Sequence, residues 1–211
     1  MTEPQPARTG ELRFIAALVA LTAIWLAMLV GGDGAVDHRI YEAIYVGDHP
    51  TLVAIALFFT VLGEPVILIV ASFGVAVWLW LRGHRHLPWA FLGIILAGRA
   101  LSVLQKHWIF RPRPDLETHL VVVKTSSFPS GHANSSMIFY VMLALILARG
   151  SDRRRVAVGT AIALSLLIGL SRVMLGVHWP SDVIGGWAFG LLWLLLTLRL
   201  SERFVKHGLK R

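Results

Sequence analysis

Six long apolar runs constrain this 211-residue chain more than any other feature of its sequence. The first run, Phe14–Val30, has seventeen residues and contains no charged side chain. The others are Pro65–Leu81, Pro88–Leu104, Ala133–Ala148, Val156–Ser171 and Val183–Leu198. Each run is close to the lower end of the roughly 17–25 residues that a helix needs to cross a bilayer. The pattern predicts an all-α protein built as a bundle of six transmembrane helices.

The composition agrees with a chain that lies in a lipid bilayer. Charged residues make up 15 % of it, whereas about 25 % of the residues in an ordinary soluble domain are charged. The net charge of +8 is better explained by cytoplasmic loops and an anionic membrane surface than by nucleic acid, which we do not expect as a partner. The absence of cysteine excludes disulfides, thiol nucleophiles and cysteine-based metal sites.

Shorter features complete the outline of the fold. A seventh apolar run, Thr51–Leu62, ends at Gly63-Glu64-Pro65 and is interpreted as an interfacial or re-entrant helix that breaks before the second span. The first run exceeds the usual 7–15-residue core of a signal peptide, so we expect an uncleaved helix. No repeat or linker divides the sequence. We therefore expect a single integral membrane domain over residues 1–211.

The distribution of lysine and arginine predicts the orientation. If the N-terminus is cytoplasmic, the inner segments carry thirteen of these residues and the outer segments carry six, while Arg99 lies within a span. Because lysine and arginine favour the cytoplasmic side, we expect both termini in the cytoplasm of a multi-pass protein of the inner (cell) membrane. The sequence leaves the oligomeric state open.

Three compact polar clusters interrupt the apolar pattern. They are Lys106–Pro114 at the end of the third span, Phe128–His132 at the start of the fourth, and Ser171–Asp182 between the fifth and the sixth. Because consecutive spans alternate in direction, all three clusters lie at one face of the membrane. With the expected orientation this is the outer face, toward the periplasm or exterior.

The clusters bring cations together. Lys106, Arg113 and Arg172 repel one another unless an anion lies among them, and arginine is suited to oxyanions such as phosphate. Ser130 can cap the fourth span or donate its hydroxyl to a phosphate oxygen, and Gly131 lets the backbone approach a ligand. The start of the helix adds free N–H groups and the positive end of its dipole. We expect a phosphate site.

The histidines supply the reactive groups. Pro180 suits the first turn of the sixth span, which places His178 just before that turn and Asp182 within it. A carboxylate on one imidazole nitrogen leaves the other as an oriented nucleophile, although Asp182 also suits a simple helix cap. His132 is placed to protonate a leaving oxygen. This arrangement predicts two-step phosphoryl transfer, through a phosphohistidine and then to water, with no set of metal ligands.

The strings KHWIFRPRP, PSGH and SRVMLGVHWPSD resemble the three signatures of the type 2 phosphatidic acid phosphatase superfamily at every fixed position. The resemblance implies a metal-independent phosphatase, without a cofactor, acting on membrane lipid phosphates in a region that spans residues 106–182. It also implies roles that agree with the chemistry above. Phosphate is bound by Lys106, Arg113, Ser130, Gly131 and Arg172, while His178 is the nucleophile, His132 the general acid and Asp182 the residue that holds His178.

Within that family we favour undecaprenyl diphosphate as the substrate. The predicted site faces outward, the outer loops are small, and Arg111 or Lys124 is available for a second phosphate, although binding to anionic lipid explains these two equally well. Phosphatidylglycerophosphate and phosphatidate are the alternatives, as is a lipid phosphotransferase that uses the same phosphohistidine. The six predicted spans argue against a soluble vanadate haloperoxidase. The absence of repeats argues against a transporter. For Arg99 two roles are open: contact with a second phosphate, or pairing with backbone carbonyls or a buried polar group.

Overall fold

The computed structural model describes residues 6–208, with side chains described from residue 9 to residue 201. That part of the chain forms helices and contains no strand. The helices are α1 (Pro6–Val30), α2 (Ala35–Ile44), α3 (Pro50–Leu62), α4 (Pro65–Leu81), α5 (Leu87–Trp108), α6 (Gly131–Leu147), α7 (Arg154–Met174) and α8 (Pro180–Gly208). The predicted all-helical class is confirmed.

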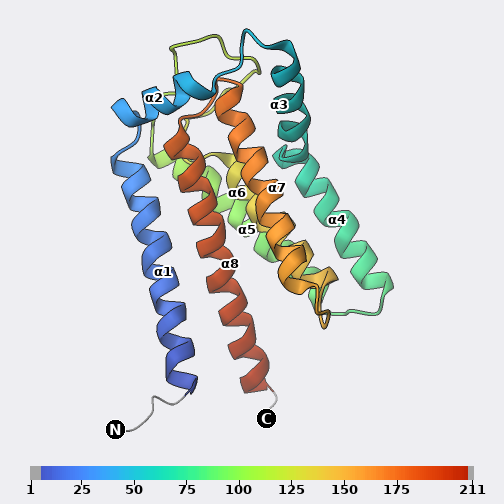
Figure 1. The fold of residues 1–211 in the computed structure, drawn as a ribbon. Coiled ribbons are helices and arrows are strands. Elements are labelled where there is room, and N and C mark those ends of the chain that lie inside the picture. The colour runs from blue at the N-terminus through green and yellow to red at the C-terminus, as the bar shows by residue number, and fades with distance from the viewer. Residues whose placement is uncertain (1–5, 209–211) are drawn as a thin grey trace.

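The long helices form a bundle around α6 (Figure 1). This helix contacts α4, α5, α7 and α8, while α1 lies along α8. In the view of Figure 1, α1 begins and α8 ends at the lower end of the bundle, and α2 crosses its upper end. The upper end is also where α7 ends and α8 begins, so the Ser171–Asp182 cluster lies there, away from the start of α1 and the end of α8.

The number of helices that can cross a membrane differs from the predicted six. Four of the described helices are long and apolar enough by themselves: Thr9–Val30 of α1, α5, α7, and Pro180–Ser201 of α8. The pair α3 and α4 passes the same test together and is bent by 44°, which raises the count to five. The remaining predicted span forms α6, whose 17 residues extend only about 26 Å.

The break between α3 and α4 agrees with the interpretation of the seventh run as a helix that ends before the second span. The residue at the break is Glu64, and Pro65 occupies the first position of α4, where the missing proline N–H costs no hydrogen bond. The hydroxyl of Tyr140 on α6 donates to the carbonyl of Leu62 at 2.9 Å. The break is thereby attached to the central helix.

Glycines allow α8 to lie very close to α6. A Cβ atom at Gly186 would lie 2.7 Å from the carbonyl oxygen of Ser130, and one at Gly190 would lie 3.1 Å from that of Asn134. Small residues with this role are common where transmembrane helices pack, because they let two backbones approach. The contact fixes the start of α6 against the start of α8, the two helices that carry predicted catalytic residues.

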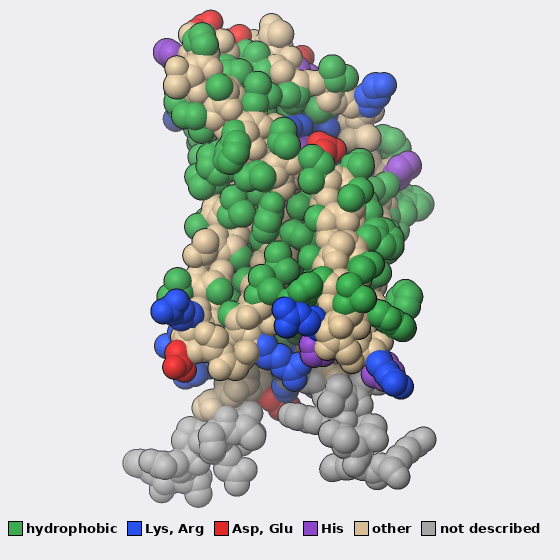
Figure 2. Space-filling view, turned by 90° about the vertical axis from the view of Figure 1, so that its right-hand side faces the viewer, with side chains coloured by type: hydrophobic (Ala, Val, Ile, Leu, Met, Phe, Trp, Pro, Cys, Tyr) green, Lys and Arg blue, Asp and Glu red, His purple; other side chains and the backbone are tan. Residues whose placement is uncertain are grey.

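The surface of the bundle has the character of a lipid-facing one. Val66, Val70, Phe73 and Val77 are all exposed and follow one side of α4. Figure 2 shows a broad hydrophobic band over this side, with lysine and arginine side chains gathered at the lower end and a small group of charged side chains near the upper end. The protein is an integral membrane protein.

Candidate active site

A cavity of about 260 Å³ opens where the polar clusters meet. Its walls come from the break between α3 and α4, from α5, from the 109–130 loop, and from the starts or ends of α6, α7 and α8. Among the described residues, the lining side chains that carry or can carry charge are Glu64, Arg99, Lys106, Arg113, Lys124, His132, Arg172 and His178. Five of them are cations and one is an acid, so the cavity suits an anion.

His178 owes its place to the way in which α7 ends. Gly176 has a φ of +78°, in the left-handed region that glycine adopts easily. The N–H of Gly176 donates to the carbonyl of Val173 and that of Val177 to the carbonyl of Arg172, which is the pattern of a Schellman motif. The chain therefore reverses at once and places His178 in the cavity wall, directly before α8.

The two nitrogens of His178 have different surroundings. Nδ1 lies 3.4 Å from Oδ2 of Asp182 and 3.3 Å from the hydroxyl of Ser127. Nε2 lies 3.4 Å from Nη1 of Arg113, which lines the cavity. Burial, followed by repulsion from Arg113, lowers the pKa of His178 well below the ordinary value. The ring is therefore neutral at neutral pH, as a nitrogen nucleophile must be.

Asp182 is fully buried and is held on every side. Its Oδ2 accepts hydrogen bonds from the hydroxyl of Ser127 and from the backbone N–H of Trp179 at 2.9 Å. Its Oδ1 accepts one from Nη1 of Arg111 at 2.8 Å. The carboxylate thus has a fixed direction toward His178. Asp182 therefore caps the start of α8 through the N–H of Trp179 and also contacts His178. The sequence had left these two roles open as compatible.

Arg111 is not placed to bind a second phosphate, the role considered for it from the sequence. Its side chain is buried and lies outside the cavity lining. Besides Asp182 it donates to the carbonyls of Met28 and Leu29 at 2.9 and 2.6 Å, and its guanidinium lies 4.4 Å from the ring centre of Phe128. A guanidinium engaged in this way is not available to a second phosphate. It instead ties α1 to the start of α8.

The three predicted phosphate-binding cations all line the cavity. Nζ of Lys106 donates to the carbonyls of Ser126 and Ser127 at 2.6 and 3.0 Å, and Arg113 donates to the carbonyl of Val177. Burial lowers the pKa of Arg113 to about 10, so that side chain remains charged at neutral pH. Lys106 and Arg113 are thus held by backbone oxygens, which do not neutralise their charge.

Arg172 is fixed differently, by a side chain. Its Nη1 donates to the hydroxyl of Thr60 on α3 at 2.5 Å. Its Nε is buried and has no hydrogen-bond partner within the described residues. A buried donor without a partner is costly unless a ligand satisfies it, so the Arg172 side chain has spare capacity for an anion.

The start of α6 carries the second predicted cluster. The backbone N–H of Ser130 donates to the carbonyl of Asp182 at 2.9 Å. The Ser130 hydroxyl does not cap the helix, and it is buried without a partner among the described residues. Gly131 lines the cavity beside Arg99: a Cβ atom there would lie 2.7 Å from Nη1 of that arginine.

Arg99 and Lys124 are the additional cations of the cavity. In the described part of the chain, no hydrogen bond or ion pair is formed by Arg99, and Glu64 is an acid close enough to interact with its charge. This removes the buried polar partner that the sequence had allowed for Arg99. Ser171, by contrast, donates to the carbonyl of Ile168 within its own helix and lies outside the cavity lining.

Three residues of the site were not predicted from the sequence: Glu64, Thr60 and Ser127. Glu64 lies with Oε2 3.2 Å from Nε2 of His132, Thr60 meets Arg172, and Ser127 meets Asp182. None belongs to a recognisable motif. For Glu64 a signal was present, since it is the one acidic residue from residue 49 to residue 105 and stands between two apolar runs, Thr51–Leu62 and Pro65–Leu81, where a charge is usually functional.

The remaining histidines near the cavity are bound by their own segments. His107 contacts the carbonyl of Val103 at 3.0 Å, and His119 that of Pro114 at 2.6 Å. Between residues 6 and 208, no three histidine, aspartate or glutamate side chains are grouped so that they could hold a metal ion.

This fold and cavity define a membrane-embedded helical bundle with an anion site at one end. Residues 87–206, more than half of the chain, match the PAP2 superfamily. The chain belongs to that superfamily.

Relatives with assigned names differ in substrate. The chain is 35 % identical over 116 residues to phosphatidylglycerophosphatase B of Bacillus subtilis, an alignment that covers 53 % of this chain but only 57 % of that protein. It is 28 % identical over 175 residues to undecaprenyl-diphosphatase BcrC of the same organism, covering 79 % of this chain and 84 % of the relative. The names therefore leave the substrate undecided.

The fold has a close counterpart among solved structures. The crystal structure of a transmembrane PAP2-type phosphatidylglycerolphosphate phosphatase from Bacillus subtilis superposes with a TM-score of 0.78 at 28 % identity. The match covers 88 % of this chain and 96 % of that one.

The contacts of Arg111 lead to a prediction about stability. Removing one partner of a buried ion pair typically costs about 3–5 kcal/mol, so Arg111→Ala should lower the thermal unfolding midpoint in detergent. Arg85→Ala, at an exposed position, is the matched control and should not change it. An unchanged midpoint for Arg111→Ala would show that the contacts with Asp182 and α1 do not stabilise the bundle.

Proposed function

We propose that the chain hydrolyses membrane lipid phosphates or diphosphates through a phosphohistidine at His178. The observation that carries the proposal is the pair formed by His178 and Asp182 in the wall of a cavity lined by five cations. The relatives, which are named as lipid phosphatases, support the same activity.

In the first step, Nε2 of His178 attacks the phosphorus atom and the bond to the leaving oxygen breaks. Asp182 holds the opposite nitrogen, so that the lone pair points into the cavity, and it stabilises the positive charge that develops on the ring. Lys106, Arg113 and Arg172 bind the phosphoryl oxygens, together with the Ser130 hydroxyl and the backbone at Gly131. His132 gives its proton to the leaving oxygen.

In the second step, a water molecule attacks the phosphorus of the phosphohistidine and the P–N bond breaks. His132, now without its proton, accepts one from the attacking water and returns to its starting state. The cations that held the phosphate in the first step stabilise the second transition state too. No redox or metal chemistry enters this sequence, and the products are inorganic phosphate and the dephosphorylated lipid.

The two histidines are expected to fail in different ways when replaced. His178→Ala should abolish turnover and form no phosphoenzyme, because the nucleophile is gone. His132→Ala should still trap radiolabelled phosphate in an acid-labile form when the leaving group is good, because breakdown also needs His132. The measurement is label retained on purified protein after brief incubation and denaturation.

The control for this trap is Asp48→Asn, at an exposed position beyond the cavity lining, which should turn over as the unchanged protein does. Label on both histidine variants, or turnover without label in His178→Ala, would contradict the two-histidine assignment.

We favour undecaprenyl diphosphate as the substrate. With Arg111 committed to Asp182, the cations available to a second phosphate are Arg99 and Lys124, both in the cavity lining. Three cations suffice to hold the transferred phosphate, and a diphosphate gives the other two an anion to bind. The likeness to an undecaprenyl-diphosphatase over most of the chain supports this choice, and the likeness to a phosphatidylglycerophosphatase supports its main alternative.

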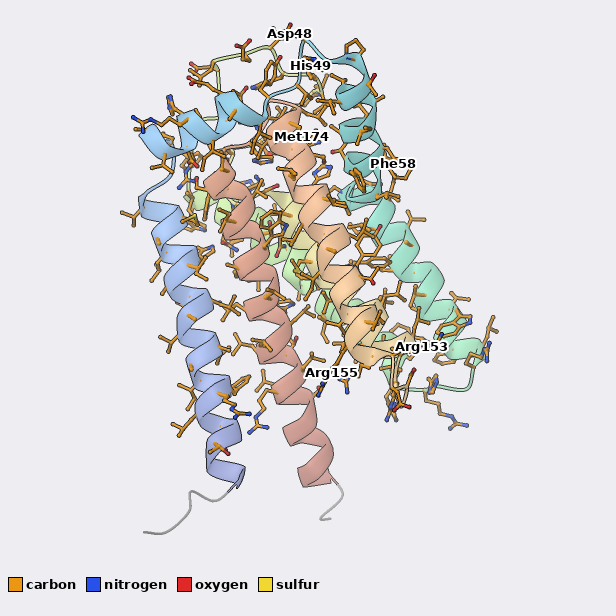
Figure 3. All side chains as sticks on the ribbon, viewed as in Figure 1. Asp48, His49, Phe58, Arg153, Arg155 and Met174 are labelled. Carbon is orange, nitrogen blue, oxygen red and sulfur yellow. The ribbon has the colours of Figure 1, made fainter. Side chains whose placement is uncertain are left out.

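Substrate preference can be measured in detergent with farnesyl diphosphate, phosphatidate and phosphatidylglycerophosphate. Arg99→Ala and Lys124→Ala should reduce kcat/KM for the diphosphate about tenfold more than for the monophosphates, a difference of about 1.4 kcal/mol. Arg155→Ala, at the opposite end of the bundle (Figure 3), should leave the ratio unchanged. A tenfold preference of the unchanged protein for a monophosphate would overturn the diphosphate assignment.

We further propose that the active site faces away from the cytoplasm of the inner membrane. Figure 3 places Arg153 and Arg155 at the lower end of α7, and Asp48, His49 and Met174 at the upper end, where the cavity lies. Of the twenty lysine and arginine residues, thirteen fall in the segments that the sequence predicts to be cytoplasmic. The described helix ends of those segments lie at this lower end (Figure 1), which favours a cytoplasmic position for it.

The orientation predicts a clear outcome for fused reporters. A reporter that is active only in the periplasm should be silent after Arg211 and active when inserted between Leu116 and Glu117, two exposed residues of the 109–130 loop. The reverse result would invert the orientation and leave the shared membrane face of the three clusters intact.

A further inference from the structure

The cavity contains a second contact between a carboxylate and an imidazole, opposite in kind to the one at His178. Oε2 of Glu64 lies 3.2 Å from Nε2 of His132. The histidine side chain is 11 % exposed and the glutamate side chain 47 %, so the pair lies at the edge of the cavity, with its acidic half toward the opening. Nε2 of His132 is buried and meets the geometric criteria of a hydrogen bond with none of the described residues, so this ion-pair distance to Glu64 is its nearest polar contact among them.

The break between α3 and α4 holds Glu64 in this place. Glu64 is the N-cap residue of α4, yet its side chain does not cap the helix, and its carboxylate is free to reach the cavity. Position 63 needs a glycine, because a Cβ atom there would collide with Ile168 and lie 3.3 Å from Cδ2 of His132. The bond from Tyr140 to Leu62 connects the break to α6, the helix that carries His132.

The charges around His132 show why a carboxylate is needed there. The ionisable groups that face it are Arg99 of α5, Arg172 of α7, His178 before α8, and Glu64. Two of these are permanent cations, which disfavour a proton on the imidazole. Glu64 is the only acid among the described residues of the lining, so before a phosphate binds it alone favours the protonated ring.

We propose that Glu64 is a positioning residue for His132, which it orients and whose protonated form it stabilises against burial and the neighbouring arginines, so that the histidine can donate a proton to the leaving oxygen. The inference rests on the proposed function and adds a residue to it. The site then contains two carboxylate–imidazole pairs: Asp182 fixes the nucleophile, and Glu64 fixes the proton donor. As the substrate leaves, the proton moves from His132 to the departing oxygen, and Glu64 remains ionised throughout.

The test compares the effect of one substitution on two substrates that differ strongly in their need for a proton on the leaving group. An alkyl lipid phosphate releases a strongly basic alkoxide, while p-nitrophenyl phosphate releases a weakly basic phenoxide. Glu64→Gln should reduce kcat for the alkyl substrate about tenfold to a hundredfold, within the range for impaired general acid catalysis. The loss for p-nitrophenyl phosphate should be at least fivefold smaller. Glu64→Asp should recover part of the loss, and Asp48→Asn is the matched control.

The pH profile gives a second measure. A general acid must hold its proton, so kcat falls as the pH rises through the pKa of His132. Without the carboxylate this descending limb should move to lower pH in Glu64→Gln. An NMR titration of the His132 ring in the substrate-free protein should move in the same direction, and this measurement does not depend on turnover.

The outcomes separate this inference from the proposed function. Equal losses on both substrates with an unmoved pH limb, or no loss on either, would overturn the role of Glu64. If Glu64→Gln unfolds in detergent, Glu64→Asp carries the same comparison, because a shorter acid alters the contact without removing the charge. Turnover that persists in His178→Ala would instead overturn the phosphohistidine mechanism, whatever Glu64 does.

Discussion

The arrangement of the site depends on the contacts of one buried group, the carboxylate of Asp182. Through its side chain it joins Arg111, Ser127 and the N–H of Trp179, and it lies against His178. The carbonyl of the same residue accepts the N–H of Ser130 at the start of α6. A charge buried in a membrane protein is tolerable only when it is paired and fully hydrogen-bonded. The hydrogen bonds that Asp182 requires therefore hold the three polar clusters next to one another.

The sequence predicted this convergence because each cluster is continuous and lies at the end of an apolar run. Lys106, Arg113, His132, Arg172 and His178 do line one cavity. The roles of Arg111 and Glu64 were not predictable in the same way. Their partners are 71 and 68 positions away in the sequence, and no periodicity connects a lone charge to a distant helix. Only the packing of α1 and of the break between α3 and α4 reveals them.

The helical class could be predicted from the apolar runs, but the number of membrane-spanning helices could not. Apolar length reports contact with lipid, but α6 is surrounded by α4, α5, α7 and α8, and eleven of its first twelve residues are buried. The length of such a helix is set by its neighbours and by the site at its N-terminus. The run Ala133–Ala148 was therefore correctly identified as a helix, although its length is below that of the four clear spans.

The residues that bind the transferred phosphoryl group and those that face the leaving group have different effects on substrate choice. In the proposed mechanism, His178, Lys106 and Arg113 act on the phosphoryl group that every lipid phosphate shares, so they do not select among substrates. Selection depends on the leaving group. A monoester releases an alkoxide, which needs the proton that Glu64 helps His132 to hold. A diphosphate releases an anion, which needs a cation such as Arg99 or Lys124. Because a protonated His132 and an ionised Glu64 together carry no net charge, the pair does not repel that anion, and one cavity can serve both classes.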